Sequence, residues 1–435
     1  GRDRMEARVN KDDEEKPKET RVMNRWVVVL GALLIQLALG SVYAFSIFTS
    51  PLSETLGCDS KSFQILGIFS AAIAVFAVTM IVAGRLQDKK GPRLIATVGG
   101  LVYGAGYVIA AFSTEDIAMM YLSYGVIGGI GLGLGYVCPL AAVVKWFPDK
   151  RGLVSGIAVA GFGAGAFVFT QAGKWVIEAS PDGLSNAFLY LGLIFLLMVV
   201  GGAQLLRNPP EGWLPKGYVP KTNGGRTDGE FEWRDMIKTK QFVMLFSMFL
   251  LSATAGLMMI ANVKNLAQYL DATGTLLVVA QFQTIAGVIA VFNGAGRICW
   301  GKASDILGRA KTMKMMFLLQ ALILFAAAGF FLVRPSGEMM QFAGLTALAS
   351  GVGFTFGGNF ALFPTTTAEY FGTKNVGINY GLVFNGYGAA GVLGGLIPGI
   401  MASAEDGFVW VFVATGIASF VAFFLAVLIR PPATD

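Results

Sequence analysis

The 435-residue chain contains no histidine and only three cysteines, and charged residues make up only 14% of it. Without histidine, a site cannot use the commonest metal ligand or the one side chain that normally titrates near neutral pH. Cys58, Cys138 and Cys299 lie far apart, so their spacing predicts neither a disulfide framework nor a metal site. The apolar segments also contain no nucleophile–base pair. We therefore expect no enzymatic activity, no metal and no cofactor.

Apolar residues are what the chain has in abundance. They make up 55% of it, and the mean hydropathy is +0.64. Because a spanning helix needs about 20 mostly apolar residues, the sequence predicts an all-α membrane protein with twelve spanning helices. These cover residues 26–48, 62–83, 94–112, 118–142, 152–174, 186–206, 241–262, 278–302, 311–333, 339–362, 377–402 and 408–429.

A polar stretch divides these segments into two equal groups. Residues 207–240 contain four prolines and two adjacent glycines, which is typical of a linker. The sequence therefore predicts an N-terminal six-helix bundle over 26–206 and a C-terminal six-helix bundle over 241–429. Residues 1–25 and 430–435 are expected to form tails.

The basic residues predict how the chain crosses the membrane. If both termini are cytoplasmic, the outside segments contain only Lys61, Lys174, Lys264 and Arg334, whereas 28 of the 33 basic residues lie on the cytoplasmic side. Such an excess of lysine and arginine in cytoplasmic loops sets the orientation of membrane proteins. The net charge of +6 follows from this topology, so it gives no reason to expect a nucleic-acid partner.

Two loops repeat one pattern at an offset of half the chain. Residues 84–93 read GRLQDKKGPR and residues 301–309 read GKASDILGR, so that each has a glycine, then an aspartate four residues on, then a glycine and a basic residue. They resemble the conserved loop between helices 2 and 3 of the major facilitator superfamily and its copy between helices 8 and 9. The resemblance implies that Asp88, Arg93, Asp305 and Arg309 control the packing of the two halves.

Further motifs narrow the resemblance. Residues 146–156 (WFPDKRGLVSG), 293–301 (NGAGRICWG), 362–364 (LFP) and 379–381 (NYG) resemble the oxalate/formate antiporter family and its relatives, the monocarboxylate transporters. This resemblance implies a monomeric secondary transporter in the cell membrane that moves small carboxylates by alternating access of its two halves.

Arg297 is the one basic residue clearly inside a predicted span, and no aspartate or glutamate is clearly inside one. A buried cation is costly unless something pairs with it, so an anionic substrate is a candidate partner. A guanidinium can form two parallel hydrogen bonds with a carboxylate. An arginine that snorkels to the cytoplasmic interface is the alternative. In the resembling family, an arginine at this place binds the substrate carboxylate.

Asn293 lies one helical turn before Arg297 and shares its face. Its amide can bind a substrate hydroxyl or keto oxygen, orient Arg297, or bond a neighbouring helix. The monocarboxylate transporters of animals resemble this chain, but they have an aspartate at the position of Asn293 and a lysine at the position of Ile47. Both departures argue against a proton relay copied from those proteins.

Aromatic residues fall at positions that resemble the substrate cage of the oxalate transporter. Such rings can exclude water and strengthen a contact between arginine and carboxylate, although packing and lipid contact are the alternatives. The candidate cage residues are Tyr43, Phe45, Tyr136, Phe162, Phe356, Phe360, Phe384 and Tyr387.

One departure from the oxalate transporter bears on the substrate. That transporter has a second cation, a lysine, at the place where Tyr387 stands in this chain. One fixed positive charge suits one carboxylate, because a second negative charge in a dry site would lack a fixed partner. We therefore expect a small monocarboxylate such as lactate or pyruvate. The resemblance to the monocarboxylate transporters implies protons as the coupled ion. An anion exchanger of the oxalate/formate type is the alternative, and a membrane sensor without transport is a remote one.

Overall fold

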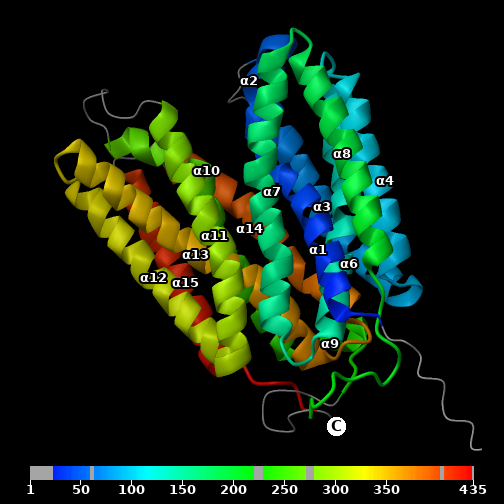
Figure 1. Ribbon diagram of the computed structural model, residues 1–435. Helices are drawn as coiled ribbons and strands as arrows, with labels where there is room; N and C mark the ends of the chain where they lie inside the picture. Colours follow the sequence, from blue (N-terminus) through cyan, green and yellow to red (C-terminus); the bar gives the residue numbers. More distant parts are fainter. Residues whose placement is uncertain (1–22, 59–62, 220–228, 271–278, 402–405, 434–435) are drawn as a thin grey trace, which may run out of the picture.

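The structure, a computed structural model, describes residues 23–58, 63–219, 229–270, 279–401 and 406–433. Within these ranges the chain forms two bundles that lie side by side (Figure 1). The N-bundle contains the rod α1–η1–α2 (Arg25–Leu39, Gly40–Phe45, Ser46–Leu56), α3 (Phe63–Lys90), α4 (Pro92–Ala111), the rod α5–η2–α6 (Ile117–Met120, Tyr121–Gly128, Gly129–Trp146), α7 (Arg151–Ala179) and α8 (Gly183–Leu205).

The C-bundle contains α10 (Lys240–Leu270), α11 (Val279–Leu307), α12 (Arg309–Val333), α13 (Glu338–Phe371), α14 (Val376–Met401) and α15 (Gly407–Leu428). One short helix, α9 (Trp233–Met236), lies in the linker between the bundles. Each bundle thus has six rods in its described part, as the sequence predicts. Ten of the twelve rods are long and apolar enough to cross a membrane in a search of the described residues.

Several helices continue beyond the apolar segments from which they were predicted. The first rod runs on to Leu56, α11 to Leu307 and α13 to Phe371. Hydropathy detects only the part of a helix that matches the hydrocarbon layer, whereas the helix itself can continue into the polar interface. In α13 the added turns contain Thr366 and Thr367, whose hydroxyls donate to carbonyls of their own helix at 2.7 Å.

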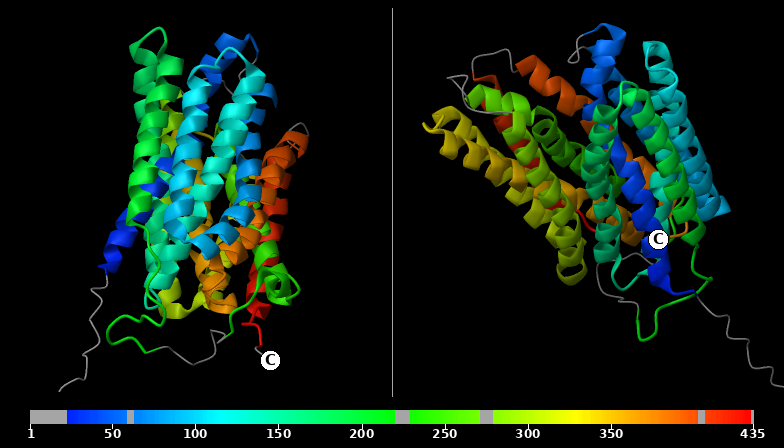
Figure 2. Two further views of the ribbon diagram at one scale, coloured as in Figure 1. Left: turned by 90° about the vertical axis from the view of Figure 1, so that its right-hand side faces the viewer. Right: turned by 45° about the horizontal axis from the view of Figure 1, so that its top comes forward.

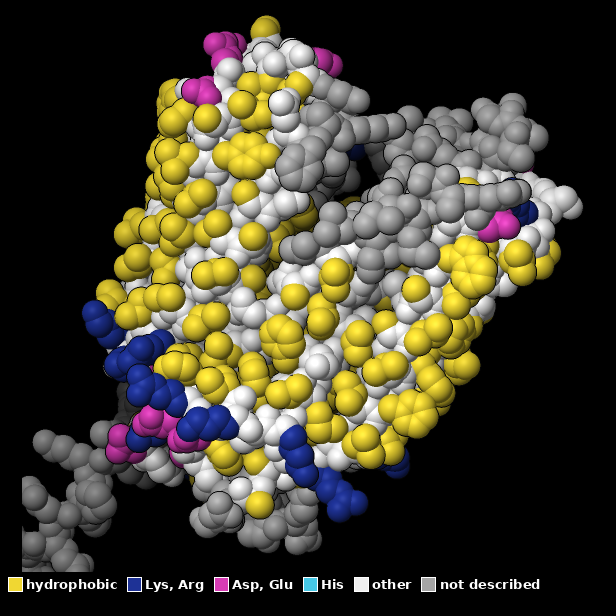
Figure 3. Space-filling model, turned by 180° about the vertical axis from the view of Figure 1, so that it is seen from behind, with side chains coloured by type: hydrophobic (Ala, Val, Ile, Leu, Met, Phe, Trp, Pro, Cys, Tyr) yellow, Lys and Arg dark blue, Asp and Glu magenta, His cyan; other side chains and the backbone are white. Residues whose placement is uncertain are grey.

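The two bundles meet at one end of the molecule, which we name the linker end because the described linker residues 207–219 and 229–239 lie there; the other is the far end. Both bundles lean apart toward the far end (Figure 1), and the start of α1 and the C-terminal segment also lie at the linker end (Figure 2). Lysine and arginine side chains gather at the linker end, and hydrophobic side chains cover the flanks (Figure 3).

Glycines allow the bundles to touch backbone to backbone near the linker end. A Cβ atom on Gly84 of α3 would lie 2.2 Å from the Gly377 carbonyl oxygen of α14. A Cβ atom on Gly156 of α7 would lie 2.2 Å from the Arg297 carbonyl oxygen of α11. Small residues let membrane helices approach closely, and here they bring Arg297 to the interface between the bundles.

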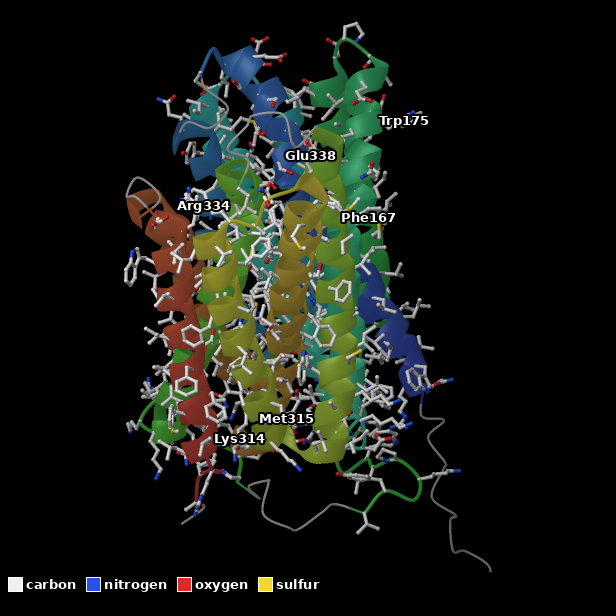
Figure 4. All side chains as sticks on the ribbon, turned by 90° about the vertical axis from the view of Figure 1, so that its left-hand side faces the viewer. Phe167, Trp175, Lys314, Met315, Arg334 and Glu338 are labelled. Carbon is white, nitrogen blue, oxygen red and sulfur yellow. The ribbon has the colours of Figure 1, made fainter. Side chains whose placement is uncertain are left out.

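The outward faces of the helices are apolar. Phe167 and Trp175 point away from α7 (Figure 4), and they are 53% and 73% exposed in the isolated chain. Such exposure would be unusual in water, but it costs little in a lipid bilayer, because lipid tails are as apolar as these side chains. The polar chemistry of the molecule is therefore concentrated between the bundles and at their two ends.

Candidate functional site

Arg297 lies at the centre of the interface between the bundles. Its helix ends ten residues later, at Leu307, which places it about 15 Å from that end at the rise of an α-helix. The predicted segment ends at residue 302, only five residues after Arg297, so the structure places this residue deeper than the sequence predicts. The side chain is 1% exposed, so it does not snorkel to the surface.

The guanidinium of Arg297 has one partner in its own helix and one in the other bundle. Its Nε donates to Asn293 Oδ1 at 2.9 Å, and its Nη1 donates to the Val159 carbonyl oxygen of α7 at 2.6 Å. No carboxylate of the described residues forms an ion pair with it. Its Nη2 has no hydrogen-bond partner among them, so N–H groups remain free for an anion.

Asn293 is oriented by this contact. Because Nε of arginine can only donate, the Asn293 oxygen must face it. The Asn293 Nδ2 group, which has no hydrogen-bond partner among the described residues, is then left as a donor beside Arg297. The site thus combines a cation with a neutral donor one helical turn away.

Aromatic rings from both bundles enclose the guanidinium. Its carbon Cζ lies 4.5 Å from the ring centre of Phe360 in the C-bundle and 5.8 Å from that of Phe162 in the N-bundle. Tyr136 packs against Phe162 and Phe384, with ring centres 5.4 and 5.3 Å apart. Cation–π contacts of this kind stabilise a desolvated arginine.

Tyrosines complete the enclosure. Tyr387 packs against Phe360 and Phe384 at 5.2 and 5.0 Å between ring centres, and Tyr43 packs against Phe162 at 5.3 Å. The Tyr136 hydroxyl is buried and has no hydrogen-bond partner in the described part of the chain. A buried hydroxyl without a partner is costly, and one beside a free guanidinium group is available to a ligand.

Two of the predicted cage residues lie apart from this cluster. The Phe45 ring packs inside the N-bundle against Phe48, Phe69 and Tyr124, and it makes no ring contact with the residues around Arg297. Phe356 contacts Phe360 at 5.2 Å between ring centres, and it is Phe360 that contacts the guanidinium of Arg297. The cluster also includes rings that the sequence did not single out, namely Phe76 of α3 and Phe249 of α10.

Asp88 links the two bundles at the linker end. Its carboxylate accepts from the backbone N–H groups of Gly377 and Ile378 at 3.0 and 2.9 Å. These groups lie in the first turn of α14, where the helix dipole also favours a negative charge. Asp88 therefore stabilises the contact between α3 and α14.

Asp305 makes the corresponding contact in the repeated loop. Its carboxylate accepts from the N–H groups of Gly152 and Leu153, in the first turn of α7, at 2.8 Å each. Arg309 donates to Asp305 at 2.8 Å and to Glu369 at 2.7 Å, within the C-bundle. Glu369, which the shorter predicted helix left outside the span, is thus 8% exposed and ion-paired.

Arg93 has a different position from its counterpart Arg309. It donates to the Gln204 carbonyl oxygen of α8 at 2.6 Å, so its contact stays within the N-bundle. Of the four residues that the repeated loops predict to control packing, the two aspartates directly join one bundle to the other.

We expect Asp88→Asn to populate states with an open linker end about tenfold more than the native chain. The amide keeps one acceptor oxygen but loses the charge, and a charge-assisted bond at a helix terminus contributes about 1–2 kcal/mol. Electron paramagnetic resonance distances between spin labels at the exposed residues 89 and 374 would measure the change. Asp116→Asn is the matched control, because Asp116 also accepts from the first turn of a helix but stays within the N-bundle.

Comparisons with known proteins agree with this architecture. A family model described as "Major Facilitator Superfamily" matches residues 28–333 and 266–435. An uncharacterised MFS-type transporter of Escherichia coli is 32% identical over 85% of this chain and 86% of that protein. The oxalate:formate antiporter of Oxalobacter formigenes is 32% identical over 94% of this chain and 92% of its own. Apicoplast pyruvate carrier 1 of Toxoplasma gondii is 25% identical, covering 84% and 82%.

Solved structures show the same fold. The proton:xylose symporter XylE superposes with a TM-score of 0.68 at 13% identity, covering 92% of this chain and 94% of that one. A bacterial homologue of the iron transporter ferroportin gives a TM-score of 0.66 at 15% identity, covering 93% and 98%. At these identities the likeness concerns the fold alone, and it confirms the predicted arrangement of helices in two halves.

Proposed function

Because the chain belongs to the major facilitator superfamily and is therefore a multi-pass membrane transporter, we propose that it carries small monocarboxylates such as lactate and pyruvate by alternating access. The observation that supports this proposal is the buried guanidinium of Arg297 between the two bundles, which has no carboxylate partner among the described residues. A cation in such a place is costly without an anionic partner, and a carboxylate can bind both of its terminal nitrogens at once.

The groups beside Arg297 favour an acid with an oxygen at its second carbon. The Asn293 Nδ2 group can donate to a keto or hydroxyl oxygen, and the Tyr136 hydroxyl can donate or accept. The surrounding rings would exclude water and so strengthen these bonds. Phe162, Phe360 and Phe384 supply the apolar walls in this assignment.

The charge of the site favours a monocarboxylate over a dicarboxylate. Arg297 is the only basic residue that contacts the cluster of rings in the described part of the chain. The aligned position of the second cation in the oxalate transporter is Tyr387 here, and a tyrosine supplies no fixed positive charge. Oxalate would therefore bring one uncompensated charge into a dry site.

The orientation and the coupling belong to the same proposal. The concentration of lysine and arginine at the linker end supports an orientation in which this end and both termini lie on the cytoplasmic side of the cell membrane. Proton-linked transport is supported by the resemblance to the monocarboxylate transporters. Exchange of one anion for another is the second candidate, and the similarity to an oxalate:formate antiporter favours it.

Uptake of labelled L-lactate into proteoliposomes tests this function. Uptake that an inward proton gradient stimulates would support proton-linked transport, whereas uptake only into vesicles preloaded with carboxylate would support exchange. Transport of oxalate with no transport of lactate or pyruvate would contradict the monocarboxylate assignment.

We expect Asn293→Leu to remove most of the preference for lactate and pyruvate over propionate, which has no oxygen at its second carbon. The substitution deletes the donor but keeps a similar volume, and a neutral hydrogen bond in a site of this kind is worth about 1 kcal/mol, or about fivefold in affinity. The ratio of the competition constants is the readout, because weaker orientation of Arg297 would affect all three acids alike. An unchanged ratio would contradict the role given to Asn293.

A further inference from the structure

A single hydrogen bond between two tyrosine hydroxyls joins the bundles beside Arg297. Tyr43, in the 3₁₀ segment η1 of the N-bundle, bonds Tyr387, in α14 of the C-bundle. The two residues are 344 positions apart in sequence, and they are brought together only by the docking of the two bundles.

These tyrosines close a ring of contacts around the guanidinium. Phe162 packs against Tyr43 on one side and lies beside Arg297 on the other. Phe360 packs against Tyr387 and lies beside Arg297 in the same way. The bond between the hydroxyls completes the ring, which takes two members from the N-bundle and three from the C-bundle.

The ring seals the site although the bundles lean apart toward the far end. Phe162, Phe360 and Tyr387 are each at most 3% exposed, and Arg297 is 1% exposed. Tyr43 alone in the ring is partly exposed. The linker side of the site is closed by the glycine contacts, so the partly exposed side of the ring must face the far end.

The segment that carries Tyr43 is irregular. Residues 40–45 form a 3₁₀ stretch between two α-helical parts of the first rod. Gly40 allows the close approach of this stretch to α7, because a Cβ atom there would overlap the Phe162 carbonyl oxygen. A 3₁₀ stretch inside a longer helix often marks a hinge, so this part of the rod can re-aim Tyr43.

We propose that the Tyr43–Tyr387 hydrogen bond is the far-end gate of the site, which must break each time a ligand passes between Arg297 and the far end. In an apolar enclosure each hydroxyl depends on the other as its partner. An arriving carboxylate or water can replace that partner, and hydrogen bonds of this type contribute only about 0.5–1.5 kcal/mol net. The contact is thus strong enough to favour the closed ring and weak enough to open often.

Alkylation of a reporter cysteine in the enclosure tests this proposal without any substrate. The reporter is Tyr136→Cys in a chain whose three native cysteines are replaced by alanine, and the probe is a small methanethiosulfonate reagent. We expect Tyr43→Phe and Tyr387→Phe each to speed the labelling about two- to tenfold. The double variant should react no faster than either single variant, because both remove the same bond.

Tyr107→Phe is the matched control. Its hydroxyl is also buried and bonds another tyrosine hydroxyl, that of Tyr103 at 3.4 Å, but both residues belong to α4 of the N-bundle, so the labelling rate should stay unchanged. Unchanged rates in Tyr43→Phe and Tyr387→Phe, or effects that multiply in the double variant, would overturn the gate. Since no carboxylate takes part in the labelling, that result would leave the proposed function untouched.

Discussion

Replacing Arg297 by lysine is expected to lower kcat/KM for lactate uptake by about 100-fold. Lysine keeps the positive charge but cannot bind a carboxylate with two parallel hydrogen bonds. Its ammonium has three N–H donors against five in the guanidinium, so it cannot bond Asn293, Val159 and both oxygens of a carboxylate at once. A hydrogen bond to a charged group contributes about 1.5–3 kcal/mol, and 1.4 kcal/mol corresponds to a factor of ten.

Arg334→Lys is the matched control for this substitution. Arg334 is partly exposed at the far end (Figure 4), where it pairs with Asp406 at 2.8 Å, so its replacement should change uptake less than twofold. Surface ion pairs of this kind contribute little. Full activity of Arg297→Lys would mean that the site needs only a positive charge and not two parallel N–H donors, which would contradict the proposed binding mode.

Adding one methyl group at Gly84 is the second change with a large expected effect. In Gly84→Ala the new Cβ atom would lie 2.2 Å from the Gly377 carbonyl oxygen and 2.3 Å from its carbon, which belong to the other bundle. Backbone atoms cannot move aside as the end of a side chain can. The linker end should therefore fail to close, and the initial rate of uptake should fall at least about tenfold if that closure costs an extra 1.4 kcal/mol or more.

The clash in Gly84→Ala affects only the contact between the two bundles. Because it lies between the bundles and not within one, the variant should fold and should show a longer distance between spin labels at residues 89 and 374. Gly201→Ala on α8 is the matched control, since nothing lies within 4 Å of its added Cβ atom. A Gly84→Ala protein with native uptake would show that α3 and α14 do not need this contact for transport.

The sequence predicts the fold well because each spanning helix leaves a long apolar signal. The same signal marks Arg297, since a single cation among apolar residues stands out whatever its neighbours are. The sequence predicts the ends of the helices less well than their presence. Hydropathy falls near residue 362, so the predicted span ends before Glu369, whereas α13 continues to Phe371.

Other parts of the site leave no trace in the sequence. The Val159 acceptor is a backbone carbonyl, and every residue has one. Phe76 and Phe249 are two of 34 phenylalanines, so composition cannot single them out. The resemblance groups Phe45 with Tyr43, but residues two apart on a helix point in different directions. In the structure, accordingly, only Tyr43 packs against a ring that lies beside Arg297.

The bond between Arg297 and the Val159 carbonyl has a kinetic consequence. It spans the two bundles, so an empty carrier that opens its linker end gives up an acceptor that its cation had. In the proposed function, a bound carboxylate stays on the same cation throughout the movement. We therefore expect the barrier to reorientation to be higher for the empty carrier than for the loaded one. The return of the empty carrier should then be the slow step of the cycle, and carboxylate on the opposite side of the membrane should accelerate it.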